Sequence, residues 1–179
     1  MFSVRLIVLI GVILAAAVSR VIPHPPNFTP IAAMALFGGA QFADRRLAFL
    51  VPLSAMFASD LVIGLHRLLP VIYACFALIV CLGFWVRQRR SIFRITGATL
   101  AGSVLFFVVT NFAVWAAGSL YPKTLEGLVA AYVAAIPFFR NTVLGDALYV
   151  VVLFGGFALI ESMVAVLRDD SPAARRQTA

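Results

Sequence analysis

Long apolar runs, separated by short polar or basic segments, dominate the chain. Five of them approach membrane length, at residues 2–19, 47–65, 70–86, 95–118 and 143–167. Because a hydrocarbon core about 30 Å thick takes roughly 20 helical residues, each run predicts one transmembrane span. A sixth run, residues 31–43, would reach only about 20 Å as a helix. It predicts a short helix that thins the bilayer, borrows length from its flanks or crosses only halfway.

Residues 125–139 are apolar as well, but Pro137 lies near the end of the stretch and Gly127 near its start. Proline interrupts the hydrogen-bond ladder of a helix, and 15 residues would extend only about 22 Å. We therefore predict an interfacial or re-entrant lid over the outer mouth of the bundle. In this interpretation Arg140 lies at the hinge end of the lid and points at a ligand or at an aspartate.

The composition places these helices in a membrane. Hydrophobic residues make up 63% of the chain and charged residues 12%, against about 45–50% and 25% in soluble domains. The predicted fold class is an all-α integral membrane protein, a six-helix transmembrane bundle with one short helix and an outer-face lid segment. We expect a single transmembrane domain at residues 1–168 and a cytoplasmic polar tail at residues 169–179. Ala15-Ala16-Ala17 resembles a signal-peptidase site, but the apolar run continues past it.

The basic residues predict the orientation. With six spans, one side of the membrane receives ten arginines and the other side four basic residues. Because the cytoplasmic side carries the excess of positive charge, both termini are predicted to face the cytoplasm at a bacterial plasma (inner) membrane. The net charge of +7 lies mostly at segment ends, where it meets anionic lipid, and does not indicate nucleic-acid binding. The four outer basic residues are Arg20, Arg67, Lys123 and Arg140.

Four prolines fall within residues 21–30, just before the short apolar run. They predict a stiff, irregular segment, because proline lacks the backbone N–H and pushes its predecessor towards an extended conformation. The segment carries His24 and Asn27. Irregular backbone in a membrane protein lies at a surface or lines a cavity. The segment is therefore either a simple interhelical loop or the rim of a binding site.

Polar residues inside the spans gather towards the outer side. Asp60, Cys75, Asn111 and Asp146 all fall within roughly 10 Å of the predicted outer surface. A carboxylate facing lipid is costly, so we predict that Asp60, Asn111 and Asp146 share one cavity close to His24. Apolar walls with a few polar groups are typical of small-molecule sites. The predicted substrate-binding residues are His24, Asn27, Asp60, Tyr73, Cys75, Asn111, Trp115, Arg140 and Asp146.

Two alternatives stay open for these residues. Asp60 could pair with Arg67, and Asp146 with Arg140, only to tie helices together. His24 and Asp60 could also act as acid and base in a membrane enzyme. The sequence has no Walker A, HExxH or GxSxG motif, so we predict no enzyme, no cofactor and no resident metal. Cys75 and Cys81 do not form a CxxC motif.

Several segments between residues 20 and 160 resemble a family of small, largely uncharacterised bacterial membrane proteins that have been assigned a transport role. The segments are His24-Pro25-Pro26-Asn27-Phe28-Thr29-Pro30, Ala33-Met34-Ala35-Leu36-Phe37-Gly38-Gly39, Ser59-Asp60-Leu61-Val62-Ile63-Gly64, Thr110-Asn111-Phe112-Ala113-Val114-Trp115, Tyr121-Pro122-Lys123-Thr124 and Ile136-Pro137-Phe138-Phe139-Arg140-Asn141-Thr142. That family is similar in turn to the six-helix substrate-binding S-components of energy-coupling-factor vitamin importers. Solitary cobalamin-importing members have a similar size and layout.

The resemblance implies capture of a small organic substrate, such as the vitamin cobalamin, at the outer face for import. It also implies an energising ATPase module as a partner. Were the substrate cobalamin, Cys75 or His24 would be the candidate cobalt ligand. The alternative function is a structural or assembly subunit of a membrane complex that binds no small molecule.

Overall fold

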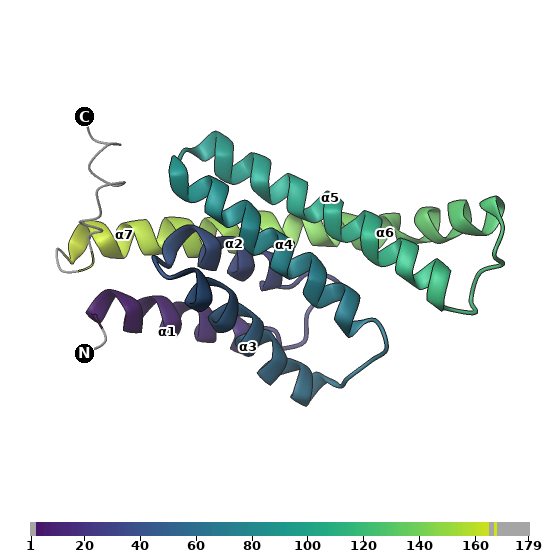
Figure 1. The fold of residues 1–179 in the computed structure, drawn as a ribbon, viewed down its shortest axis with the longest axis horizontal. Helices are drawn as coiled ribbons and strands as arrows, with labels where there is room; N and C mark the ends of the chain where they lie inside the picture. Colours follow the sequence, from purple (N-terminus) through teal and green to yellow (C-terminus); the bar gives the residue numbers. More distant parts are fainter. Residues whose placement is uncertain (1–2, 165–166, 168–179) are drawn as a thin grey trace.

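The computed structural model describes residues 3–164 and 167, and all regular structure in that part of the chain is helical. Six helical rods run back and forth, so that α1 begins and α7 ends at the same side of the bundle (Figure 1). The predicted tail at residues 169–179 lies outside the described residues. The elements are α1 (Val4–Ser19), α2 (Ile31–Gln41), α3 (Arg45–Ile63), α4 (Leu69–Gln88), α5 (Ile92–Ala117), α6 (Leu125–Val150), a π-helical turn η1 (Val151–Gly155) and α7 (Gly156–Met163).

Polar caps explain where four of the helices begin. In each case a side-chain oxygen just before the first turn accepts a hydrogen bond from a backbone N–H that has no partner inside the helix. The bonds run from Leu6 N, Arg46 N, Arg94 N and Gly127 N to the side chains of Ser3, Asp44, Ser91 and Thr124. Five apolar runs therefore became α1 to α5 with bounds within three residues of the prediction.

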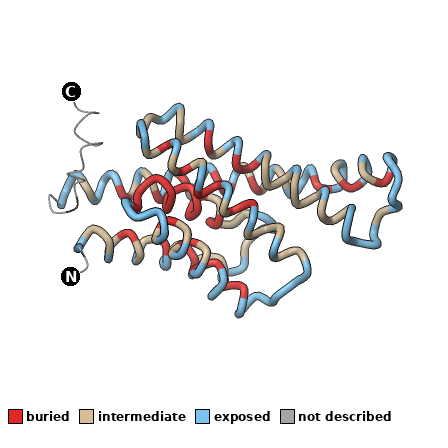
Figure 2. The backbone as a smooth tube through the Cα atoms, viewed as in Figure 1, coloured by how far each residue is buried: buried red, intermediate tan, exposed pale blue. Residues whose placement is uncertain are grey.

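The short helix α2 lies at the centre of the bundle. Every residue from Ala33 to Gln41 is buried, which Figure 2 shows as the densest red in the molecule. Its backbone packs closely against α4, because Gly39 and Gly83 face each other without side chains between them. A helix that is surrounded by protein need not match the bilayer thickness, which is why 11 residues suffice.

The lid prediction is wrong. Residues 125–139 form the first part of α6, which continues through η1 and α7 as one 39-residue helix from Leu125 to Met163. Pro137 lies inside this helix, where it removes one backbone hydrogen bond without ending it. At 1.5 Å per residue the rod is about 58 Å long, roughly twice the thickness of a hydrocarbon core. Together with α5 it forms a hairpin that extends past the ends of α3 and α4 (Figure 1).

Four helices are long and apolar enough to cross a membrane, namely α3, α4, α5 and the combined rod from α6 to α7. Large apolar side chains cover their outward surfaces, and on α5 and α6 these include Leu100, Val104, Val129 and Val133, each about half exposed. Side chains of this kind are stable on the outside only where lipid replaces water. The fold is therefore an all-α membrane bundle, as the sequence predicted.

The topology can be tested with cysteines at Ser91 and Thr124, the caps at the start of α5 and α6. Since α5 separates them, we expect a membrane-impermeant maleimide to label one position from outside the cell and the other only after lysis. The background chain carries Cys75→Ala and Cys81→Ala, and by itself it must remain unlabelled. Labelling of both positions from the same side would contradict the six-pass arrangement.

Candidate functional site

A cavity of about 190 Å³ opens where the α5–α6 hairpin rises past the start of α4. Helices α4, α5 and α6 form its walls, and the proline-rich segment before α2 contributes its rim through Asn27. Four phenylalanines supply most of the apolar surface, which suits a flat or ring-shaped ligand. The lining residues are Asn27, Leu68, Ile72, Phe106, Phe107, Thr110, Asn111, Val114, Ala135, Phe138, Phe139 and Thr142.

Three polar side chains on the cavity walls donate to their own helices. Thr110 Oγ1 donates to Phe106 O at 2.7 Å, and Asn111 Nδ2 donates to Phe107 O at 2.7 Å. Thr142 Oγ1 donates to Phe138 O at 3.0 Å. These bonds leave lone pairs on the hydroxyl oxygens and on Asn111 Oδ1. The walls therefore offer a ligand mainly hydrogen-bond acceptors.

The rim of the cavity is held in an unusual backbone conformation. Asn27 has φ 63°, in the left-handed region that asparagine tolerates better than most other residues. Two hydrogen bonds fix the turn around it, from Phe28 N to Pro25 O at 3.0 Å and from Asn141 Nδ2 to Pro26 O at 3.0 Å. The second bond ties the rim to α6, so the segment is more than a loose interhelical loop.

An ion pair outside the cavity lining joins α1 and α3. Arg20 Nη1 lies 2.5 Å from Asp60 Oδ1 and donates to Ser59 Oγ at 2.7 Å. Tyr73 OH on α4 donates to Asp60 Oδ2 at 2.8 Å. Asp60 is only 2% exposed, so this cluster satisfies a buried carboxylate and joins three helices. Asp60 thus forms the helix-tying pair that the alternative interpretation expected, but with Arg20 in place of Arg67.

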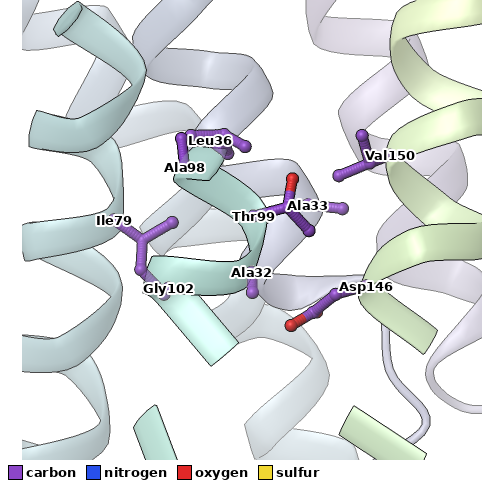
Figure 3. Close-up of a pocket in the computed structure, with 9 residues that line it drawn as sticks. All are labelled: Ala32, Ala33, Leu36, Ile79, Ala98, Thr99, Gly102, Asp146 and Val150. Atoms are coloured by element: carbon purple, nitrogen blue, oxygen red, sulfur yellow. The ribbon is translucent and has the colours of Figure 1, made fainter. Parts of the chain in front are cut away.

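The second buried carboxylate, that of Asp146, is not part of the Asp60 cluster. Asp146 on α6 is 2% exposed, and its Oδ2 lies 2.6 Å from Ser103 Oγ on α5. It borders a narrow void between small and apolar side chains (Figure 3). Asp146 and Asp60 do not line the cavity that holds Asn27 and Asn111. The prediction of one shared cavity for Asp60, Asn111 and Asp146 is therefore wrong.

Over residues 1–168 the chain matches the model of a family of unknown function. The chain belongs to DUF6580. A search of curated proteins found no match, and a search of solved structures found none. The family match covers the whole helical bundle, but it carries no activity, substrate or partner.

In this DUF6580 chain, two of the nine predicted site residues line the cavity, Asn27 and Asn111, and two others, Asp60 and Tyr73, contact each other outside it. Tyr73 joins the Arg20 cluster beside the cavity, and Cys75 is 1% exposed without lining it. Both ring nitrogens of His24 lie close to backbone oxygens, Nδ1 at 2.9 Å from Pro25 O and Nε2 at 3.2 Å from Arg20 O.

The other two predicted residues lie on the hairpin of the DUF6580 chain. Trp115 donates from Nε1 to Pro122 O at 2.9 Å near the hairpin tip, under the ammonium group of Lys123. Arg140 is exposed on α6 and does not line the cavity. Neither of the two ion pairs among the described residues involves Arg140. The clamp that the lid hypothesis assigned to Arg140 therefore has no support in the geometry.

Sequence reasoning missed the two threonines of the DUF6580 cavity and the partner of Asp60. Thr110 directly precedes Asn111, and Thr142 lies four residues before Asp146, so each shares a helix turn with a residue that was predicted. Arg20 follows the first apolar run directly, but nothing in the sequence shows which neighbouring helix it faces.

Proposed function

We propose that this protein captures a small, uncharged organic molecule from the outer side and passes it across the membrane. The observation that carries the proposal is the cavity itself. It joins Asn27, from a strained rim, to Asn111, near the C-terminal end of the hydrophobic helix α5. The cavity opens beside the start of α4, where the α5–α6 hairpin extends past α3 and α4. An amide at such a depth is costly in lipid and useful beside a ligand.

The size of the cavity narrows the choice of substrate. About 190 Å³ lies below the roughly 300–1,000 Å³ of sites for drug-sized molecules. A corrinoid is larger than a drug-sized molecule, so the cavity cannot enclose one. Cys75, the candidate cobalt ligand, is buried away from the lining. A small vitamin-like or metabolite-like compound therefore fits better than cobalamin.

The lining residues also restrict the chemical class of the ligand. Among the described residues, those that line the cavity include no charged side chain, so nothing there would balance a ligand charge. The phenylalanines on α5 and α6 favour stacking on a flat ring. The acceptor oxygens of Thr110, Asn111 and Thr142 favour a ligand that carries N–H or O–H groups. A neutral aromatic or heteroaromatic compound with donor groups satisfies both requirements.

Transport against a gradient needs an energy source. The sequence has no Walker A motif for nucleotide hydrolysis. The energy for import would therefore come from a partner, such as the ATPase module that the resemblance implies, or from an ion gradient. An acid–base reaction by His24 and Asp60 fits less well, because the Asp60 carboxylate is occupied by Arg20 and Tyr73 and does not line the cavity.

The proposal predicts that gently purified protein carries a small molecule. We expect mass spectrometry of the extract to detect a compound that Asn111→Leu lowers at least tenfold, because leucine removes the acceptor at the centre of the wall. Gln88→Leu, which replaces an amide at the opposite end of the bundle, is the matched control and should leave the amount unchanged. If wild-type extracts contain only lipid and detergent while partner proteins co-purify, the assembly-subunit alternative gains support and this proposal fails.

A further inference from the structure

Asp146 is the one buried carboxylate of the described helices that has no basic partner. Asp60 is paired with Arg20, and Glu161 is paired with Arg5 at the other end of the bundle. Among residues 3–164 and 167, the one side-chain partner of the Asp146 carboxyl group is the hydroxyl of Ser103. Neither the cavity nor the proposed capture step makes use of this group. A free carboxylate in such surroundings is strongly disfavoured, so the site must supply a cation or a proton.

The other side chains that line the void beside Asp146 carry no charge. Helix α2 presents small and aliphatic side chains, α4 presents Ile79, and α5 presents small residues and Thr99. Cys75, the titratable residue one turn from Ile79 on α4, does not border the void. Figure 3 shows Asp146 at one edge of this group of side chains, next to Ala32. The lining residues are Ala32, Ala33, Leu36, Ile79, Ala98, Thr99, Gly102, Asp146 and Val150.

The hydrogen bonds at Ser103 point to a proton. Ser103 Oγ lies 2.6 Å from Asp146 Oδ2 and 3.0 Å from the carbonyl oxygen of Thr99. A hydroxyl group has one hydrogen, so it makes one good hydrogen bond as a donor. Both contacts are satisfied when Asp146 carries a proton and donates to Ser103 Oγ, while Ser103 donates to Thr99 O. The void beside the carboxyl group has no room for a water molecule, and so none for a hydrated metal ion.

The same pair lies one helical turn below the substrate cavity. Thr142 lines the cavity four residues before Asp146 on α6, and Phe106 lines it three residues after Ser103 on α5. Gly145 packs against the backbone of Phe28, next to the rim residue Asn27, where a Cβ atom would lie 3.1 Å from Phe28 Cα. A change in the Asp146–Ser103 contact would therefore shift the residues at the floor and the rim of the cavity.

We propose that Asp146 and Ser103 form an intramembrane proton-binding site that couples proton entry to the state of the outer cavity. In the loading step, α5 and α6 are apart and water from the cavity reaches the carboxylate, so that an oxygen of Asp146 takes a proton from a hydronium ion. An O–H bond forms, and a neutral water molecule remains behind. The neutral acid lets α5 and α6 close, whereas the carboxylate draws water in from the cavity and separates them. The coupling rests on the proposed function, but the proton site itself does not.

Infrared difference spectroscopy on the full chain in lipid nanodiscs tests the site without any substrate. A pH titration should reveal the C=O stretch of a protonated carboxyl group that shifts with ¹³C-labelled aspartate. Asp146→Asn should abolish this band, and Ser103→Ala should shift it because one hydrogen bond is lost. Asp60→Asn, which changes the ion-paired carboxylate, is the matched control and should leave the band in place.

The inference has clear ways to fail. It is overturned if wild-type protein shows no aspartic-acid band at pH values where exposed aspartates such as Asp44 are ionised, or if Asp146→Asn leaves that band unchanged. Replacing choline ions in the buffer by sodium ions should leave the C=O band unchanged. Loss of the band on addition of sodium would identify a sodium site instead. Since the label reports on wild-type protein, the result stands even if a variant fails to fold. Because no substrate is added, failure here is distinguishable from failure of the proposed function.

Discussion

Arg20→Ala is expected to lower the free energy of unfolding by about 3–5 kcal/mol. The guanidinium group is the ionic partner of Asp60, whose carboxylate is 2% exposed and also accepts from Tyr73. Its removal leaves a buried charge that neither lipid nor water can reach. It also removes the hydrogen bond to Ser59 that helps to hold α1 against α3. Unfolding in a detergent titration measures the change directly.

Arg67→Ala is the matched control for this prediction. Arg67 lies at the same end of the bundle, but it is exposed and has no ion-pair partner among the described residues. Its replacement should change stability by about 0.5 kcal/mol or less, as for surface positions generally. Asp60→Asn should fall between the two, because the amide keeps one acceptor and removes the buried charge. Equal losses for Arg20→Ala and Arg67→Ala would show that the ion pair does not support the fold.

Gly39→Ala is expected to lower the free energy of unfolding by about 3 kcal/mol or more, at the upper end of overpacking effects. A Cβ atom at this position would overlap the carbonyl oxygen of Val80 and lie 2.9 Å from Gly83 Cα. Both obstacles are backbone, which cannot rotate away as a side chain can. Helix α2 would have to separate from α4 at the centre of the core. Loss of stability in detergent, and of folded protein in the membrane, is the measurement.

Gly97→Ala provides the control for this second prediction. A Cβ atom at Gly97 meets nothing within 4 Å, so the substitution tests only the backbone of α5. Alanine favours a helix over glycine by about 0.5–1 kcal/mol, and the variant should be as stable as wild type or slightly more so. If Gly39→Ala behaves in the same way, the close approach of α2 and α4 is not a determinant of the fold.

Apolar runs were enough to predict α1 to α5, because chain segments of that length and polarity have one stable state in a bilayer. The prediction that was wrong concerned residues 125–139. Pro137 and Gly127 lie there and suggested a short, interrupted helix, yet α6 continues through both. A helix packed against a neighbour tolerates the missing hydrogen bond of a proline, and α5 supplies that neighbour along most of its length.

The sequence predicted the depth of the site in the membrane, but not which side chains contact each other. The hydrophobic surroundings of Asn111 and the stiff segment around Asn27 predicted polar groups near the outer side, and the structure places both on one cavity. Which carboxylate meets which arginine depends on how each helix is rotated and on which helices are neighbours. A run of apolar residues says little about either, so Arg20 could not be recognised as the partner of Asp60.

The central position of α2 has a consequence for how the protein inserts into the membrane and folds during its synthesis. With 11 residues, the helix is too short to enter a bilayer by itself, and apart from α1 the helices that enclose it are synthesised after it. A nascent chain that has just left the ribosome would therefore hold α2 near the membrane surface until α3 and α4 emerge. The final fold of the first 63 residues must then be a late, post-insertion event, driven by the arrival of segments encoded downstream.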